Sequence, residues 1–148
     1  MKLITRNTDY AIRALCCIAG QNKDIISADY LVKSLGMPRP FLRRILQSLK
    51  KEGLLNSYKG KGGGFCLAVQ PKKINVIHIM KIFQGHIKIN ECNFKKKRCP
   101  KINHCILKNK VDEIEEEVVH RLEKITIDSL LENKNKKRVG ENENGTKN

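Results

Sequence analysis

Residues 27–53 constrain the fold most, because they hold two short amphipathic helical patterns separated by only a few residues. The first pattern begins at Ser27, a residue type that caps helices, and is followed by Gly36, a residue type that ends them. Its apolar stripe consists of Leu31, Val32 and Leu35. The spacing predicts a helix of about two turns.

The second pattern opens at Pro38, whose missing N–H costs nothing in a first helical turn, and ends at Gly53. Its apolar face consists of Phe41, Leu42, Ile45, Leu46 and Leu49. Two short helices joined by a tight turn that contains Gly, with the second helix rich in Arg and Lys, are typical of a helix-turn-helix.

Residues 54–69 follow as two strand-like runs around a tip of Lys and Gly, which predicts a β-hairpin, or wing. Apolar residues at helical spacing predict one helix between Asp9 and Ala19 and another over 76–85. We therefore expect a mainly α fold with a small β-hairpin wing, in which residues 1–86 form a winged helix-turn-helix DNA-binding domain.

The rest of the chain divides into three segments. Residues 87–106 have no sustained period and are predicted to be a loop, whereas 107–131 are predicted to hold a long C-terminal dimerisation helix with a last turn capped by Thr126. The helix has a narrow apolar seam of the kind that pairs with its own copy. Its members are Val111, Ile114, Val118, Leu122 and Ile125. Residues 132–148 are a polar tail and are predicted to be disordered.

Charge is distributed unevenly along the chain. The formal net charge is +15, with 21 Lys and Arg against 5 Asp and Glu in residues 1–106, and 4 against 8 in residues 107–132. A basic body favours an anionic partner, and with a helix-turn-helix we expect double-stranded DNA. No apolar run approaches the about 20 residues of a membrane span, and charges interrupt the N-terminal run, so we expect a cytoplasmic protein without a membrane partner.

The first two turns of the second helix of a helix-turn-helix reach base edges in the major groove. The predicted base-reading residues are Arg39, Pro40, Arg43 and Arg44. Lys50 and Lys51 lie further along and should contact phosphate, while Lys59 and Lys61 at the wing tip should contact the minor groove or phosphate. The glycine-rich tip lacks the Walker spacing, which argues against a nucleotide-binding loop.

Three of the six cysteines, Cys92, Cys99 and Cys105, fall within one short irregular segment and are candidate metal ligands. Three thiolates suit an iron-sulfur cluster or zinc, and a direct thiol redox switch is a further alternative. Cys16, Cys17 and Cys66 lie on predicted regular elements and should behave as small hydrophobic residues. The chain has no Cys-x-x-Cys pair and no evident nucleophile-base arrangement, so we do not expect a thiol redox enzyme or any other enzyme.

Four features together resemble the IscR/NsrR-type family of winged helix-turn-helix regulators over about residues 1–131. They are residues 1–15, residues 41–46, the wing Lys59-Gly-Lys-Gly-Gly-Gly-Phe-Cys-Leu-Ala68 and the cysteine trio. The resemblance implies a homodimer joined by the helix at 107–125 and a 4Fe–4S or 2Fe–2S cluster on the trio. It also implies a repressor that senses nitric oxide, redox or iron-sulfur status. A two-fold dimer suits a palindromic operator.

The chain departs from IscR-like members at the fourth ligand. Lys108 stands where those proteins have a histidine, and His104 is out of register. The resemblance to NsrR-like members implies instead that Asp9 of the partner subunit is a possible fourth ligand, with a role as N-terminal helix cap as the alternative. The wing also differs, with Lys59 where arginine is usual and Phe65 where tyrosine is common.

Overall fold

The computed structural model describes residues 2–21, 24–89, 93–94 and 97–133. Its helices are α1 (Arg6–Ala19), α2 (Ala28–Leu35), α3 (Arg39–Lys51), α4 (Val76–Gln84) and α5 (Ile106–Glu123), with helical turns at Pro71–Lys73 and Ile102–His104 and a helical segment at 127–133. The strands are β1 (Leu55–Tyr58), β2 (Gly64–Leu67), β3 (Asn93–Phe94) and β4 (Lys97–Arg98). β1 pairs antiparallel with β2, and β3 with β4. Mainly helical architecture with a hairpin wing confirms the predicted fold class.

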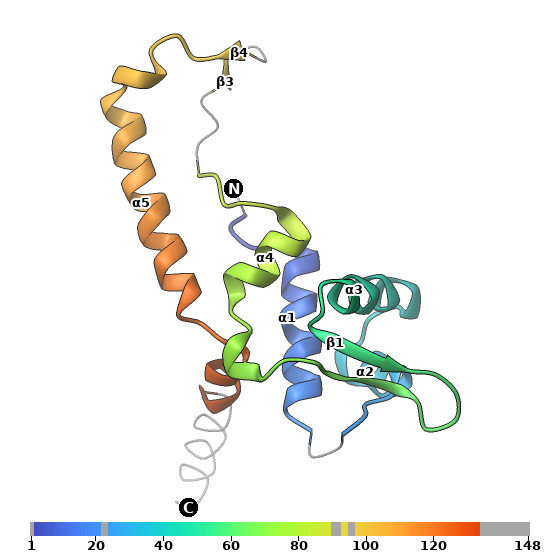
Figure 1. Ribbon diagram of the computed structural model, residues 1–148. Helices are drawn as coiled ribbons and strands as arrows, with labels where there is room; N and C mark the ends of the chain where they lie inside the picture. The colour runs from blue at the N-terminus through green and yellow to red at the C-terminus, as the bar shows by residue number, and fades with distance from the viewer. Residues whose placement is uncertain (1, 22–23, 90–92, 95–96, 134–148) are drawn as a thin grey trace, which may run out of the picture.

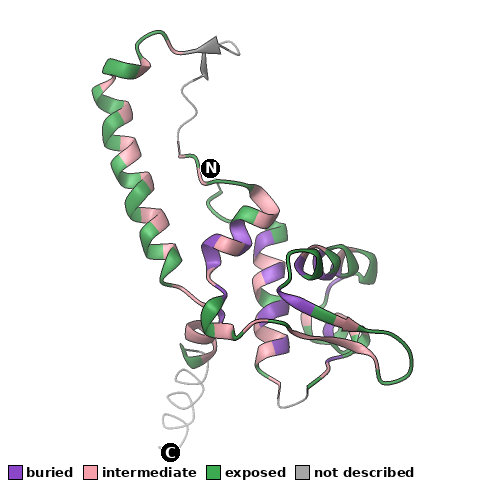
Figure 2. Cartoon of the chain, in the orientation of Figure 1, coloured by how far each residue is buried: buried purple, intermediate pink, exposed green. Residues whose placement is uncertain are grey.

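The core forms around α1, which contacts α2, α3, α4 and β2. Ala11, Ala14 and Leu15 of α1 are fully buried. The two small alanines let the neighbouring helices approach closely, and Leu15 fills the space between them. The apolar faces predicted for the two helices of the helix-turn-helix, with Leu31 on α2 and Leu49 on α3, pack into this core. Figure 2 shows the buried residues gathered inside the body formed by α1 to α4 and the wing.

Helix ends follow the capping residues of the sequence. The Ser27 hydroxyl accepts from the Tyr30 amide at 3.2 Å, and Gly36 ends α2 in the left-handed region with φ 61°, as predicted. Thr5 caps α1, which therefore begins before the apolar pattern that starts near Asp9. The first turn of α1 is polar and carries no apolar period, so the pattern alone placed the start too late.

The wing is joined to the segment that precedes α2. Ile26 and Phe65 exchange two backbone hydrogen bonds of 2.8 Å, which continue the hairpin pairing of β2 onto the residues just before α2. A Cβ on Gly64 would lie 2.2 Å from the Ile26 carbonyl oxygen, so the close approach requires glycine at this position. The hairpin is thereby held beside the helix-turn-helix.

α5 stands beside the body and packs against α4 (Figure 1). None of its residues is buried in the described chain. After α5 the chain returns through an isolated bridge between Asn75 and Thr126, and Ile127 in the next segment is fully buried. Thr126 caps that segment by accepting from the Ser129 amide at 3.1 Å, as expected. Thus α5 is fixed to the body at its C-terminal end.

The segment predicted as a loop, 87–106, contains the β3–β4 hairpin and the turn at Ile102–His104 among its described residues. Strands of two residues are too short to produce a period in the sequence. α5 begins at Ile106 with Cys105 as its N-cap, slightly before the apolar seam indicates. The predicted disorder of the tail concerns mainly residues 134–148, which lie outside the described residues. No helix among those described is long and apolar enough to cross a membrane.

Candidate DNA-binding surface and cysteine segment

One face of α3 is buried and the other is basic. The buried face holds Leu42, Ile45, Leu46 and Leu49. The residues predicted to read bases, Arg39, Pro40, Arg43 and Arg44, are all exposed. Pro38 is the N-cap rather than the first helical residue, and Pro40 occupies the first turn, where a missing N–H breaks no helical bond. The helix therefore presents its first two turns to a partner while its apolar side stays in the core.

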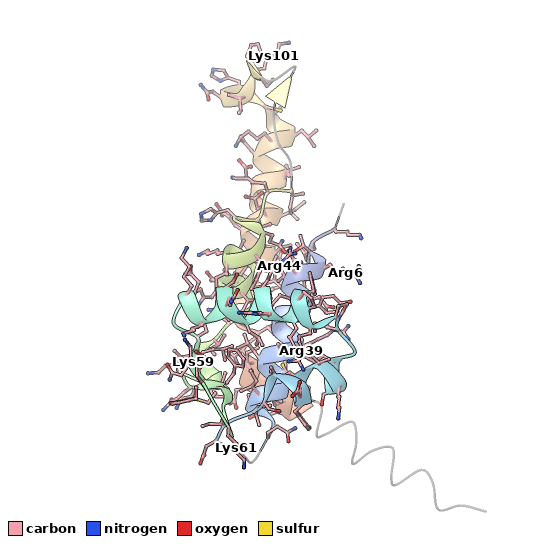
Figure 3. The ribbon with its side chains drawn as sticks, turned by 90° about the vertical axis from the view of Figure 1, so that its right-hand side faces the viewer. Arg6, Arg39, Arg44, Lys59, Lys61 and Lys101 are labelled. Carbon is pink, nitrogen blue, oxygen red and sulfur yellow. The ribbon has the colours of Figure 1, made fainter. Side chains whose placement is uncertain are left out.

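The predicted phosphate contacts lie at the end of α3 and at the wing tip. Lys50 and Lys51 form the last turn of α3 and are exposed, as are Lys59 and Lys61 at the tip of the hairpin. Figure 3 shows α3 crossing the same face that carries the hairpin, with Arg39 and Arg44 on the helix and Lys59 and Lys61 on the wing. The structure thus gathers cations from two separate segments on one surface.

Glycines shape the wing tip. The Gly63 amide donates to the Gly60 carbonyl at 3.0 Å, and Gly60 and Gly62 have φ values of 90° and 77°, in the region that favours glycine. A Cβ on Gly63 would lie 2.4 Å from the Tyr58 carbonyl oxygen. The tip is therefore a tight turn with little side-chain bulk, which allows the backbone to approach a duplex closely.

An ion pair that the sequence analysis did not find involves one of the predicted base-reading residues. The Arg39 guanidinium at the start of α3 contacts the Asp29 carboxylate in the first turn of α2. Both side chains are exposed. The sequence could not predict this ion pair, because the two residues are ten apart and lie on different helices. They meet only through the angle between α2 and α3.

Two of the three candidate metal-ligating cysteines, Cys99 and Cys105, are described, and Cys92 lies outside the described residues. Cys99 follows β4 and its carbonyl accepts from the Ile102 amide at 3.1 Å. Cys105 is the N-cap of α5, and its Sγ accepts from the Lys108 amide at 3.4 Å. In the part of the chain that the structure describes, no three His, Cys, Asp or Glu residues form a group that could hold a metal ion.

Lys108, which stands in the position of the histidine of IscR-like proteins, pairs with Asp112 one turn further along α5. The lysine ammonium is cationic and is not a ligand for iron or zinc. His104 is exposed in the turn before Cys105. The residue three positions beyond Cys105 is therefore a lysine engaged in an ion pair, and the described sulfur atoms near the start of α5 are those of Cys99 and Cys105.

Asp9 lies in the first turn of α1, where its carboxylate accepts from Arg13 Nε at 2.9 Å. The alternative interpretation of Asp9 as the helix cap is wrong, because Thr5 fills that position. Figure 1 shows β3 and β4 at the far end of α5, away from α1 of the same chain. Within one chain, Asp9 pairs with Arg13 of its own helix and lies away from the segment that holds β3 and β4.

The other cysteines differ little from the expectation for small hydrophobic residues. Cys16 and Cys17 are partly buried and pack against the main apolar cluster, and Cys66 on β2 is partly buried. In the part of the chain that the structure describes, Cys66, Cys99 and Cys105 form no disulfide bond.

Comparison with known proteins places this architecture in a family. A family model described as "Rrf2: Iron-dependent Transcriptional regulator" matches residues 4–133. The chain is 31% identical over 124 residues to an HTH-type transcriptional regulator of Aquifex aeolicus, covering 82% of this chain and 86% of the relative. It is also 31% identical over 132 residues to the HTH-type transcriptional regulator NsrR of Halalkalibacterium halodurans, covering 88% and 90%.

Solved structures share the fold. T. potens IscR superposes with a TM-score of 0.70 at 22% identity, covering 90% of this chain and 88% of that one. CymR, the global cysteine regulator of B. subtilis, superposes with a TM-score of 0.68 at 20% identity, covering 89% and 98%. The matched family is one of transcriptional regulators rather than enzymes. This chain is a DNA-binding, helix-turn-helix transcriptional regulator of the Rrf2 family.

Proposed function

We propose that the protein is a sequence-specific regulator, acting as a repressor, whose affinity for a palindromic operator is controlled by an iron-sulfur cluster on Cys92, Cys99 and Cys105. The observation that carries the sensing part is that Cys105 is both a candidate ligand and the N-cap of α5. The state of its sulfur therefore acts directly on the start of the helix that is proposed to join two subunits.

Base reading is assigned to the start of α3 and backbone contact to its end and the wing. Arginine matches the acceptor pair of guanine in the major groove, whereas lysine acts as a point charge on phosphate. The exposed Arg43 and Arg44 stand in the first two turns, and Lys61 stands at the wing tip. A helix in the major groove and a hairpin reaching toward a neighbouring groove together determine orientation on the duplex.

Dimer formation is assigned to the N-terminal part of α5. Of the predicted seam, Leu122 and Ile125 pack against the apolar cluster of α4 in the same chain. Ile106, Leu107 and Ile114 are 80%, 68% and 54% exposed, large fractions for apolar side chains. An apolar surface of this kind on a helix favours pairing with a second copy. We therefore place the contact between subunits around residues 106–118.

The described thiols fit an iron-sulfur group in their chemistry. Thiolates are the ligands that such clusters use, and Cys99 and Cys105 are only partly exposed at the start of α5. When bound, the cluster supplies a centre that reacts with oxidants and nitric oxide. A thiolate that holds a cluster keeps lone pairs that accept N–H bonds, so Cys105 would hold the group while its sulfur still caps α5. Gain or loss of the group would change the charge at this N-cap, and that change would bias the α5 pair between two arrangements and, with it, the spacing of the two α3 helices.

Asp9 of the partner subunit is proposed as the fourth ligand. A carboxylate is available in the first turn of α1, and among the described residues its side chain is held by an exposed ion pair with Arg13, which is weak and easily exchanged. The site is then complete only in the dimer.

The test is anaerobic purification followed by visible absorption and by iron and sulfide analysis. The proposal predicts a brown protein with iron and sulfide in the wild type and in Cys66→Ser, and colourless protein in Cys99→Ser. Zinc in place of iron would instead indicate a structural metal site, and absence of any metal would favour a direct thiol switch. Mössbauer spectra of the wild type and Asp9→Ala should differ if Asp9 is a ligand.

A further inference from the structure

We propose that Asp29 is a specificity-determining residue that orients Arg39 for guanine recognition, at the expense of overall affinity for DNA. The proposal rests on the DNA-binding surface assigned above. It concerns an exposed acidic side chain on α2 that contacts an exposed arginine at the start of α3.

The geometry brings one carboxylate to the start of the recognition helix. Asp29 Oδ1 contacts Nη2 of Arg39, and the two side chains are 67% and 61% exposed. The contact printed for the pair is made through one terminal nitrogen, and most of the Arg39 side chain is exposed, so N–H donors of the guanidinium remain accessible. A guanidinium has five donors in a planar fork, enough to hold a carboxylate and to bind guanine O6 and N7 simultaneously.

Arg39 and Arg43 differ in this respect. Both line one hollow of about 260 Å³ between α2, α3 and β2, so they stand one helical turn apart on the same side of α3. Among the described residues, no carboxylate forms an ion pair with Arg43. Arg39 is thus the base-reading candidate whose long side chain is restrained before DNA arrives. Restraint of a flexible side chain lowers the entropy lost on forming a bidentate contact.

A carboxylate near a duplex also has an unfavourable effect, because it repels the phosphates of every sequence. Asp29 should therefore lower affinity for non-specific DNA while it raises the preference for guanine opposite Arg39. The Asp29 carboxylate would repel every duplex, whereas its orientation of Arg39 would help only the duplex with guanine at the right position. The combination increases the discrimination between specific and non-specific DNA. Asp29 should thus lower the affinity for non-specific DNA and raise the preference for guanine. A purely electrostatic effect would instead change the affinity for all duplexes in the same direction.

The experiment compares wild type, Asp29→Asn and Asp29→Ala in selection from a randomised duplex library, followed by titration of the selected site and of a non-specific duplex. One base pair of each half-site should lose its guanine preference by about tenfold in Asp29→Asn, the size of one bidentate contact, and by at least as much in Asp29→Ala. Affinity for the non-specific duplex should rise in both variants. Arg39→Lys should lose preference at the same base pair.

The matched control is Glu52→Gln, which makes the same change in charge at the far end of α3. It should raise affinity for both duplexes without changing base preference. The proposal is overturned if Asp29→Asn shifts both affinities together, as the control does, or if it strengthens the guanine preference. A wild type that selects no sequence would contradict the proposed function itself, whereas selection with an unchanged guanine profile in Asp29→Asn contradicts only the role of Asp29.

Discussion

Single side chains connect parts of this chain that are distant in sequence. Gln84, the last residue of α4, accepts from the Thr5 amide at 2.9 Å and from the Thr8 hydroxyl at 2.7 Å, and donates to the Leu3 carbonyl at 2.9 Å. Thr8 is fully buried, and its hydroxyl is satisfied by Gln84 together with the Thr5 hydroxyl, which lies 3.0 Å away. One amide thereby ties the start of α1, where Asp9 lies, to the end of α4, from which the chain leaves toward the cysteine segment.

Gln84→Leu should destabilise the protein by about 1–3 kcal/mol, because the Thr5 amide loses its side-chain acceptor and the buried Thr8 hydroxyl loses one of its two partners. Chemical denaturation measures the change. Gln47→Leu, at an exposed position of α3, is the control and should change stability little. Equal effects of the two substitutions would show that the Gln84 hydrogen bonds contribute nothing specific.

Two glycines of the wing provide a second test at this scale. Gly64→Ala should displace the wing from Ile26, because its Cβ would lie 2.2 Å from the carbonyl oxygen. A Cβ at Gly62 would meet nothing within 4 Å. Gly62→Ala is unfavourable only because of the positive φ of 77°, which should lower the free energy of unfolding by about 1–2 kcal/mol. We expect Gly64→Ala to lose more stability and more DNA affinity than Gly62→Ala. The reverse order would contradict the joint between the wing and α2.

At the scale of elements, α5 is held at one end and capped by a sulfur atom at the other. Its C-terminal half packs on α4, while the residues near Cys105 remain largely exposed. A helix that is packed at its C-terminal half and exposed at its N-terminus can respond to a chemical change at its N-cap sulfur. Serine is also an N-cap residue, so Cys105→Ser should keep the helix and its stability while it removes the thiolate.

Ile114→Glu should weaken the dimer by more than about tenfold, because a carboxylate would have to be desolvated in the apolar contact between subunits. Analytical ultracentrifugation over a range of concentrations measures the change. Asn109→Glu, at an exposed position of α5 outside the seam, is the control. If both variants dimerise as the wild type does, the contact lies elsewhere.

The elements that the sequence predicted are those with strong local signals. Ser27 and Gly36 determine the ends of α2, and alternating Lys and Gly predict the wing. Features that depend on how elements meet were not predicted. The contact of Asp29 with Arg39 and the bonds of Gln84 arise from packing angles, and a sulfur N-cap at Cys105 is an unusual use of cysteine. For the same reason the spacing made the three cysteines candidate ligands but could not predict how they would assemble, and their role as ligands stays a prediction.

For the whole molecule, the division of charge is the dominant feature. Lys and Arg greatly outnumber Asp and Glu in residues 1–106, whereas acidic residues predominate in 107–132. The basic surface of α3 and the wing is thereby separated from the proposed subunit contact. Phosphate neutralisation by such a surface releases counterions, so binding should weaken steeply as salt rises.

Lys61→Ala should weaken binding to all duplexes alike and reduce the slope of log affinity against log salt by about 0.9, the value for one phosphate contact. Arg43→Ala should instead relax base preference at one position. Lys124→Ala, at the C-cap of α5, is the control for loss of a positive charge. Unchanged affinity in both Lys61→Ala and Arg43→Ala would contradict the assigned surface.

The central claim is that the cysteine site controls DNA binding. The most direct measurement is anaerobic titration of a library-selected duplex by the same protein sample before and after iron is removed by a chelator. The account predicts that affinity changes by at least about tenfold, within the usual range of allosteric coupling, and that Cys105→Ser is insensitive to the treatment. Identical affinities of the wild type with and without its iron would contradict it.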